Sequence, residues 1–567
     1  MRARGWWAVA VVLCLGCSRP AERFEDAPVQ TFSAGACRVA ALPAPRPPPD
    51  HPAGYTGWTL SSRRVEHLLH RTLEVDGQAG AGDPRFPAAA GVASATRHGV
   101  TRPALYVWGG ATARMDLQVP PRGGRLVFFV ATAAGQALGR IVVHEGEQHR
   151  AVYTSSNRPS ALPTWTRRVV DLGPFSDRHV VLELAAQGDG VALFGAMRLL
   201  GPRVPERAPN VIVYDLEGLR ADHLGAWGAA DTRTPNLDRI GVEGARFGEA
   251  IAVTSRDGPS IPSLLTARFP TNPPGDGATL QERFAAGGWR TGAFSARDDV
   301  TGPGFDVRVG PARWPGSSDG DFVGAASLRG ALLAFAREER DTPFFAFVHT
   351  VEPAMYARPK YAEGKGTPYD RAVREADAQV AELTETLRAE HLAKDTLIVF
   401  LSDRGESLGG HGVHGSGASL YQSEVWVPLV FWSARAIPPL VVDRPVSLVD
   451  VGPTLLGLFG LPALPHPDGV DLGPYLAGDA AVIRTHAPSA LLPTATGTPP
   501  AFSVVRADGI KLIRTGDATQ VFDLRADPCE VQTTGAVPVG LRAWLDAWAS
   551  ARSPGSTGAG GGSSPAH

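Results

Sequence analysis

Lysine is scarce in this chain. Only four of its 55 basic residues are lysines, and the others are arginines. Charge of a single sign is also lacking, since the formal net charge of the 567 residues is -2. A nearly neutral chain has no overall field that would draw it to nucleic acid, so no nucleic-acid partner is expected. Cysteine is equally rare, and four residues exclude a scaffold built on disulfides.

The residues that are plentiful indicate an ordinary globular protein. Apolar residues make up 43% of the chain and charged residues 20%, which excludes global disorder and a coiled coil. Glycine and proline number 65 and 49, so many loops are expected. A chain of this length predicts about two to four domains.

The first 17 residues resemble a bacterial lipoprotein signal peptide. Two arginines precede an apolar run from Trp6 to Leu15, which is too short to span the roughly 30 Å of a bilayer. The run ends in Leu15, Gly16 and Cys17, a lipoprotein-like box in which Cys14 stands where leucine is usual. We therefore expect an exported lipoprotein, anchored to the membrane through Cys17, that faces the periplasm or the cell surface. A plain secretion signal is the alternative.

Residues 18 to 55 are rich in proline and alanine and predict a tether that holds the body away from the membrane. After processing at Cys17, the other remaining cysteines are Cys37 in this tether and Cys529 near the end of the chain. An exported pair could form a disulfide. The sequence leaves open whether the two thiols meet.

Residues 56 to 204 predict an all-β sandwich domain. Short apolar runs separated by turn residues indicate strands, and helical spacing is scarce. The strand-like runs lie at 125–131, 139–143, 180–184 and 191–200. Sandwiches appended to exported enzymes often bind sugars, and Tyr106, Trp108 and Trp165 could stack on a glycan. The alternative is that these aromatic rings pack in the core.

Residues 205 to 550 alternate strand-like and helix-like segments and include a small subdomain from about residue 470. Strands are expected at 211–214, 292–295, 344–349 and 397–401, and helices from 234, at 376–387 and at 455–459. Such alternation predicts an α/β fold with a mainly parallel sheet flanked by helices. Functional groups are then expected at the carboxyl ends of the strands, just after Val213, His349 and Leu401. The Gly/Ser-rich residues 551 to 567 predict a disordered tail.

Several motifs occur in order between residue 208 and about residue 535. They include LRADHLGAWG at 219–228, TPNLDRI at 234–240, SLLTARFP at 263–270, LIVFLSDRGESLGGHG at 397–412, VSLVDVGPTLLGLFGLP at 446–462 and LRADPCE at 524–530. By these motifs the chain resembles the sulfatase family of the alkaline phosphatase superfamily. The resemblance implies the α/β fold of that superfamily.

The resemblance also implies a chemistry, the hydrolysis of a sulfate ester by a covalent nucleophile beside a divalent cation. The family's nucleophile is a cysteine or serine oxidised to formylglycine, in the pattern nucleophile-x-Pro-x-Arg before the SLLT motif. Carboxylates with Asn or His hold the hard cation, which activates the nucleophile and neutralises the transferring oxyanion. A His or Lys handles protons at the leaving group.

The catalytic positions implied by the resemblance are replaced in this chain. Counting back from SLLT places Asp257 at the nucleophile, where it cannot become formylglycine, and Ile261 at the motif arginine. Ala354 stands at the substrate-side histidine. The family's Gly-His-Gly reads Gly-Ser-Gly at 415–417, although His411 and His414 lie nearby as candidate catalytic residues.

The metal-binding positions are replaced as well. Glu217 stands at the first metal aspartate, and the Asp-His or Asp-Asn ligand pair becomes Asp403 and Arg404. A guanidinium cannot ligate a cation and stays protonated. We therefore hypothesise that Arg404 occupies the metal position and bridges Glu217, Asp257 and Asp403. The alternative is a solvated Arg404 beside an empty cleft. No cofactor is expected, unless the site is active, in which case Ca²⁺ or another divalent cation is implied.

Three functional hypotheses follow. The leading one is an exported sulfatase-family lipoprotein, a sulfuric ester hydrolase by ancestry, that has lost the family's mechanism and acts in binding or as a scaffold, with a glycan or sulfated ligand. The rival is an active sulfatase or phosphoesterase of the cell envelope with a rebuilt site, where Thr254, Ser255, Ser260 or Asp257 supplies the nucleophile. The third is a working sulfatase whose motifs are aligned in a different register.

Overall fold

A computed structural model of the chain describes residues 65–80, 83–201, 208–229, 232–271, 277–297, 300, 302–311, 322–434, 436–478, 483–493 and 500–551. The predicted signal peptide with Cys17, the tether with Cys37 and, apart from its first residue, the predicted tail lie outside these described residues. Among the helices that are described, none is both long enough and apolar enough to cross a membrane.

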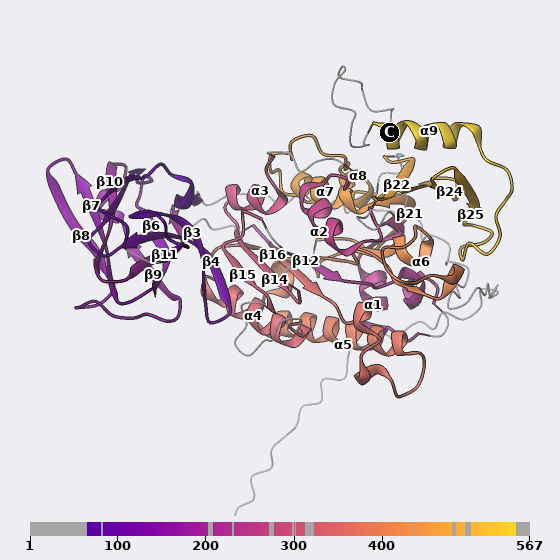
Figure 1. The fold of residues 1–567 in the computed structure, drawn as a ribbon, viewed down its shortest axis with the longest axis horizontal. Helices are drawn as coiled ribbons and strands as arrows, with labels where there is room; N and C mark the ends of the chain where they lie inside the picture. The colour runs from indigo at the N-terminus through magenta and orange to yellow at the C-terminus, as the bar shows by residue number, and fades with distance from the viewer. Residues whose placement is uncertain are drawn as a thin grey trace, which may run out of the picture.

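The centre of the molecule is a mainly parallel sheet (Figure 1). Its strand order is β21-β13-β20-β17-β12-β16-β14-β15. These strands are β12 (Asn210–Leu216), β13 (Ala245–Ile251), β14 (Arg290–Ser295), β15 (Val307–Val309), β16 (Phe344–Thr350), β17 (Thr396–Leu401), β20 (Trp426–Trp432) and β21 (Leu440–Ser447). The five strands from β17 to β15 run parallel, whereas β20 is antiparallel to both of its neighbours. Every residue of β12, β16 and β17 is buried, as expected for strands covered on both faces.

Helices cover both faces of this sheet (Figure 1). One face packs against α1 (Pro235–Glu243), α4 (Ala325–Glu338) and α5 (Pro368–Ala389), and the other against α2 (Asp257–Thr266), α3 (Leu280–Ala286) and α7 (Val451–Leu458). Each set buries an apolar stripe, with Leu237 and Val380 on the first face and Leu264 and Phe284 on the second. The predicted α/β fold with a parallel sheet between helices is confirmed.

A smaller antiparallel sheet follows the α/β body. It consists of β22 (His486–Leu491), β23 (Ala501–Arg506), β24 (Ile510–Thr515) and β25 (Ala518–Asp523), paired in sequence order, and α9 (Val539–Ser550) packs against β23. Four of the short elements that precede it are the strands β18 (Ser407–Leu408) and β19 (His414–Gly415) and the single-turn helices α6 (Gln422–Val425) and α8 (Gly473–Leu476).

The amino-terminal part of the described chain is a β-sandwich (Figure 1). Its strands are β1 (Val65–His67), β2 (Glu74–Asp76), β3 (Ala90–Arg97), β4 (Val100–Trp108), β5 (Thr112–Gln118), β6 (Arg125–Ala133), β7 (Ala137–Glu145), β8 (Gln148–Thr154), β9 (Thr166–Asp171), β10 (His179–Gly188) and β11 (Val191–Leu200). One sheet has the order β2-β5-β10-β7-β8, and the other contains β4-β11-β6-β9 with β1 and β3 as additional strands. Leu117 and Leu184 of the first sheet share a core with Val130 and Phe194 of the second.

The three aromatic residues considered as glycan platforms pack into the sandwich. Trp108 is buried and donates its indole N–H to the Phe86 carbonyl at 3.0 Å. Tyr106 is buried, and half-buried Trp165 packs against the same core and donates to the Val100 carbonyl at 3.0 Å. Their polar atoms are hydrogen-bonded and their rings contribute to the core. These residues therefore follow the core-packing alternative and not the glycan-stacking one.

The sandwich is continuous with the α/β body. Strand β15 pairs with β4 in antiparallel register, with Arg308 opposite Thr101, so that one sandwich sheet extends the central sheet into 14 strands. Buried Arg198 of β11 also lies 3.4 Å from Asp306 and 3.1 Å from Glu339, both in the α/β body. The sequence predicts two successive domains, and the structure joins them through this pairing, which connects segments about two hundred residues apart and leaves no local signal.

Candidate functional site

Charged side chains converge where the central parallel strands end. Glu217 follows β12, Arg297 follows β14 and Arg404 follows β17, while Asp257 is the first residue of α2. Neighbouring parallel strands end at the same edge of the sheet, which is where α/β folds place their functional groups. We call these four residues, together with Glu406, the strand-end cluster.

Arg404 is the centre of the strand-end cluster. Its side chain is 2% exposed, Nη2 contacts Glu217 Oε1, and Nε lies 2.5 Å from Asp257 Oδ1. Nη1 lies 3.0 Å from Glu406 Oε2. Three carboxylates therefore surround one guanidinium, which offsets the desolvation of the buried positive charge. The sequence hypothesis expects Asp403 as the third carboxylate, and the structure places Glu406 there.

A second guanidinium completes the cluster. Nη2 of Arg297 lies 3.0 Å from Glu217 Oε1, and its Nη1 lies 3.1 Å from Asp257 Oδ2. The Arg297 side chain is 35% exposed, so it forms the solvent side of the cluster, whereas Arg404 forms the buried side. The sequence analysis missed Arg297, although it follows the predicted strand at 292–295 and so satisfies the same strand-end rule as Arg404.

Asp403 lies next to Arg404 but forms none of the ion pairs of that guanidinium among the described residues. Its backbone N–H donates to Asp215 Oδ1 at 2.9 Å, and its carbonyl accepts the Ser260 hydroxyl at 2.8 Å. Burial and the negative charge of Asp215 raise the pKa of Asp403 well above its ordinary value, with the charge of Arg404 opposing that shift. Asp403 thus adjoins the cluster without an ion pair of its own to Arg404 among the described residues, and its buried position favours the protonated acid.

The electrostatics of the cluster follow from burial and mutual contact. Burial alone would lower the pKa of Arg404, but the charges of Asp403, Glu217 and Asp257 raise it above its ordinary value. For Glu406, burial outweighs the attraction of Arg404 and raises the pKa to about 7. Arg404 is therefore a permanent cation, and Glu406 titrates near neutral pH.

His349 connects the cluster to Ser295. The imidazole is buried at the end of β16, with Nε2 2.9 Å from Glu217 Oε2 and Nδ1 3.0 Å from the Ser295 hydroxyl. The Ser295 oxygen also accepts the backbone N–H of Arg297 at 3.1 Å. Ser295 and His349 are thus hydrogen-bonded, and the imidazole lies against the Glu217 carboxylate. The motifs did not predict this grouping, because His349 served there only to mark a strand end.

Most side chains near Asp257, the residue at the nucleophile position, already contact other groups of the protein. Asp257 is 46% exposed at its side chain and accepts hydrogen bonds from the Ser416 hydroxyl at 3.3 Å and from Arg297 Nη1 at 3.1 Å, and it forms an ion pair with Arg404. Ile261 is buried in the hydrophobic core of the α2 face and points to no ligand space. Ser260 is bonded to the Asp403 carbonyl, and Thr254 accepts the Arg256 backbone N–H at 3.3 Å. The hydroxyl of Ser255 is buried without a hydrogen-bond partner among the described residues.

Ala354 lies beneath the turn that follows Glu217. Its backbone N–H donates to the Glu217 carbonyl at 3.1 Å. Gly218 adopts a φ of +78°, and a Cβ placed on it would lie 2.9 Å from Ala354 Cα. Small residues are thus required at this contact, and Ala354 supplies no group that could move a proton.

The two histidines predicted as catalytic lie elsewhere. His411 has a φ of +55° and stacks on Tyr421 with ring centroids 3.8 Å apart. His414 lies in the short pairing of β18 with β19 and is exposed. Within the described part of the chain, neither imidazole joins the ion pairs of the strand-end cluster.

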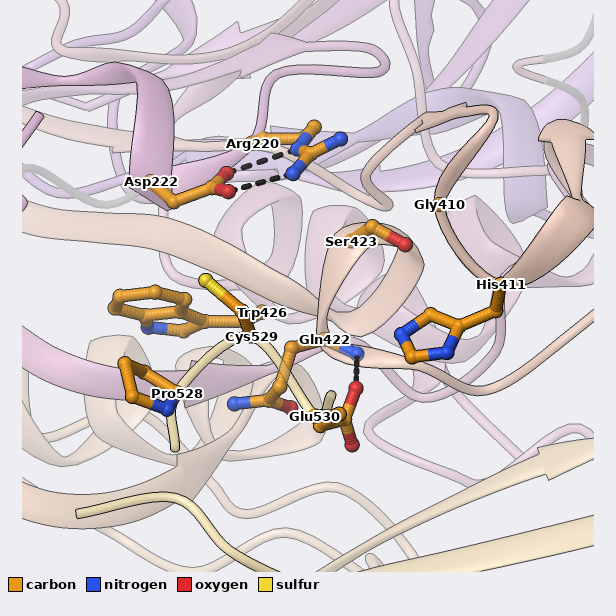
Figure 2. Close-up of a pocket in the computed structure, with 10 residues that line it drawn as sticks. All are labelled: Arg220, Asp222, Gly410, His411, Gln422, Ser423, Trp426, Pro528, Cys529 and Glu530. Carbon is orange, nitrogen blue, oxygen red and sulfur yellow. Dashed lines mark hydrogen bonds and ion pairs between the residues drawn. The ribbon is translucent and has the colours of Figure 1, made fainter. Parts of the chain in front are cut away.

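His411 instead lines a pocket of about 370 Å³, a volume that includes the part open to solvent (Figure 2). A bidentate ion pair between Arg220 and Asp222 forms one wall, and Trp426 and Cys529 form another (Figure 2). Cys529 is disulfide-bonded. Arg220 also donates to the Glu406 carbonyl at 3.2 Å, so this pocket adjoins the strand-end cluster through a single residue.

The strand-end cluster does not fit a divalent cation. Arg404 and Arg297 place two positive groups directly against Glu217 and Asp257, the carboxylates that a cation would need. A guanidinium offers donors only and cannot be deprotonated in a protein. Among the residues that the structure describes, no group of three or more acidic, histidine or cysteine side chains is arranged to hold a metal ion.

Comparisons with known proteins agree with this fold. Residues 209–461 match the family model described as Sulfatase. The chain is 28% identical over 349 residues to arylsulfatase A of Homo sapiens, covering 48% of this chain and 68% of that protein. It is 26% identical over 424 residues to steryl-sulfatase of Rattus norvegicus, covering 50% of this chain and 73% of that protein.

Solved structures show the same architecture. A 2-O GAG sulfatase matches with a TM-score of 0.53 at 18% identity, covering 61% of this chain and 93% of that chain. A protein solved with its substrate D-glucosamine-2-N,6-O-disulfate matches with a TM-score of 0.52 at 18% identity, covering 61% and 97%. The sheet and its helices therefore define an α/β protein with the alkaline phosphatase-like fold. Over residues 209–461 the chain thus resembles the sulfatase family, and it is similar to these curated sulfatases.

Proposed function

We propose that this sulfatase-family protein no longer hydrolyses sulfate esters and acts in binding or as a scaffold at the cell envelope. The observation that carries the proposal is the Arg404 guanidinium, which lies between Glu217 and Asp257. By family resemblance, these are the positions of the metal ligands and the nucleophile. A permanent cation of the chain itself thus replaces the group on which the family's chemistry depends.

The state of Asp257 supports the loss of hydrolysis. Its two carboxylate oxygens are bound to Arg404 and to Arg297, at 2.5 Å and 3.1 Å. A carboxylate that attacked a sulfur or phosphorus centre would have to give up both ion pairs. Ile261, at the motif arginine, is buried in the core and cannot hold the transferring oxyanion.

The proposed location is outside the cytoplasm, with the protein anchored through Cys17. The basic and then apolar start of the chain supports this location, and so does the disulfide at Cys529, because disulfides persist in oxidising compartments. The proposed partner is a glycan or a sulfated ligand. Since Tyr106 and Trp108 pack in the core of the sandwich, such a ligand would have to bind on other surfaces.

A rebuilt hydrolase is the second candidate, and one contact favours it. The Ser295 hydroxyl is hydrogen-bonded to His349 at 3.0 Å, and His349 Nε2 lies 2.9 Å from Glu217. A serine beside an imidazole is the pairing that can activate a serine nucleophile. Against it, Ser295 is buried, and Glu217 is shared with two guanidinia.

A turnover assay distinguishes these candidates. The purified full chain is incubated with a chromogenic aryl sulfate and with an aryl phosphate, each with added calcium, magnesium or zinc. We expect no turnover above that of the heat-denatured protein. Turnover that is lost in Asp257→Asn or in Ser295→Ala, but kept in the control Thr386→Ala on the exposed face of α5, would overturn the proposal and identify the nucleophile.

A further inference from the structure

A disulfide-bonded cysteine forms part of the wall of the pocket that His411 lines. Cys529 is 5% exposed and lies on that wall (Figure 2), and it is disulfide-bonded. The chain's three other cysteines all precede Val65, the first described residue. The amino-terminal part of the chain therefore meets the pocket at Cys529. We propose that residues 33–37, which we call the Cys37 segment, occupy this pocket and are held there by a disulfide between Cys37 and Cys529.

The disulfide decides where its second half lies. The Cβ atoms of two bonded cysteines are about 3.5–4.5 Å apart. Since Cys529 is a lining residue, the backbone on either side of its partner must run along the pocket. Cys37 is the partner, because the proposed signal cleavage removes Cys14 and the proposed lipidation uses Cys17.

The chain is long enough for this connection. Val65 begins β1, which pairs with β11 in the sandwich, whereas Cys529 packs in the core of the α/β body. The 27 residues 38–64 are rich in proline. An extended Pro-rich chain spans about 3.1 Å per residue, or roughly 80 Å in all. This reach exceeds the width of a compact chain of this size, which is about 60 Å.

The pocket suits a small and uncharged occupant. Its arginine and carboxylates are already paired, in the contacts Arg220–Asp222 at 2.8 Å and Glu530–Lys511 at 2.7 Å. The hydroxyl of Ser423 is buried there without a hydrogen-bond partner among the described residues. The four residues before Cys37 are Ser-Ala-Gly-Ala, which carry no charge and bring their backbone N–H and C=O groups. Such a backbone supplies the partner that a buried hydroxyl normally has.

The bond requires an oxidising compartment, in agreement with the proposed location. Each thiol loses one proton and one electron, and a disulfide-bearing oxidant takes up both protons and both electrons as it is reduced to a dithiol. The Cys37 segment then lies beside Arg220, which joins the pocket to the strand-end cluster. An external ligand would reach the pocket only after the disulfide is reduced. The inference goes beyond the proposed function and does not depend on whether the cluster hydrolyses esters.

Chemical modification of His411 in the full chain tests this inference. Diethyl pyrocarbonate acylates accessible imidazoles, and mass spectrometry gives the rate at each site. His411 lines the pocket, whereas His414 is exposed and is not one of its lining residues, so it serves as the internal control. We expect His411 to react several-fold more slowly in the oxidised wild type than in Cys37→Ser. The rate at His414 should be the same in both.

A matched pair of variants separates occupancy of the pocket from the disulfide. Gly35→Arg places a bulky charged side chain in the Cys37 segment, and Gly54→Arg makes the same change in the tether outside it. Peptide mapping without reduction should find the Cys37–Cys529 disulfide in both variants. We expect fast modification of His411 in Gly35→Arg and slow modification, as in the wild type, in Gly54→Arg.

Three outcomes would overturn the inference. The first is an equal rate at His411 in wild type and Cys37→Ser, and the second is slow modification of His411 in Gly35→Arg. The third is a Cys529 that is bonded to a second copy of the chain, which appears as a dimer on a gel without reductant. If Cys37→Ser does not fold, treatment of the folded wild type with a phosphine reductant gives the same comparison. Turnover is not part of this readout, so a failure here leaves the proposed function untouched.

Discussion

The Nε atom of Arg404 lies 2.5 Å from Oδ1 of Asp257, across the gap between a strand end and the start of α2. This contact ties the loop after β17 to the helix that by resemblance carries the nucleophile. A carboxylate at the amino terminus of a helix is favoured by the helix dipole. The guanidinium adds a second favourable charge beside the Asp257 carboxylate.

Arg404→Ala should destabilise the protein strongly. Removing one partner of a buried ion pair leaves uncompensated charges on Glu217 and Asp257, which is expected to lower the free energy of unfolding by about 3–5 kcal/mol. Urea denaturation followed by circular dichroism measures this change. The control is Arg297→Ala, whose half-exposed side chain should contribute about 1 kcal/mol or less. An equal loss of unfolding free energy in the two variants would contradict a larger contribution from the buried Arg404 ion pairs.

Glu406 should make stability depend on pH near neutrality. Its pKa is raised to about 7 in the folded protein, above the ordinary glutamate value of 4.5. The folded state therefore binds more protons than the unfolded state between these values. The stabilisation by the protonated acid is complete below pH 4.5 and is lost as the pH rises through 7, by about 3 kcal/mol.

The test compares unfolding free energies of the wild type and Glu406→Gln from pH 5 to pH 8. The variant cannot lose its proton, so its stability relative to the wild type should increase across this range. The control is Glu375→Gln, whose carboxylate pairs with Lys360 at 2.8 Å on the surface. Its curve should run parallel to that of the wild type. A constant difference between wild type and Glu406→Gln would show that Glu406 does not titrate there.

Arg198→Met should weaken the junction between the sandwich and the α/β body. Asp306 and Glu339 would lose their buried partner, with an expected loss of about 3–5 kcal/mol in the free energy of unfolding. The matched control is Arg178→Met, because Arg178 pairs with Glu145 at 2.7 Å on the surface and should contribute under about 1 kcal/mol. Separate wild-type unfolding transitions for sandwich and body would contradict the continuous sheet.

Peptide mapping without reduction should find Cys529 in a disulfide. The other three cysteines are Cys14, Cys17 and Cys37, and removal of the predicted signal with lipidation of Cys17 leaves Cys37 as the expected partner. Cys529→Ser should lower the free energy of unfolding by about 2–4 kcal/mol. Mass spectrometry of the unreduced protein provides the measurement, and a free thiol at Cys529 would refute the prediction.

Much of the fold could be predicted because its signals are local. The apolar runs at 344–349 and 397–401 are the strands β16 and β17, and the periodic segment at 376–387 lies within α5. Buried parallel strands need continuous apolar runs, which a sequence displays directly. The pairing of β15 with β4 could not be predicted, because a register between segments so distant in the chain has no local signature.

The candidate site was predictable only in part. Motif spacing brings Glu217, Asp257 and Arg404 to one sheet edge, as the structure also places them. Two carboxylates flank Arg404 in the sequence, at 403 and 406, and spacing cannot tell which of them meets the guanidinium. The turn after β17 decides it, because the Asp403 backbone is held by Asp215 and Glu406 is left to face Arg404.

By itself, the sequence determined the α/β fold, since that is written in residue types and their spacing, and it predicts by resemblance that the family's catalytic residues are replaced. Only the tertiary structure decided that Arg297 joins Arg404, that Glu406 takes the place expected for Asp403, and that His411 turns toward Tyr421. The physical reason is that ion pairing depends on side-chain positions within a few ångströms. Those positions are set by loops after strands that lie far apart in the chain and side by side in the sheet.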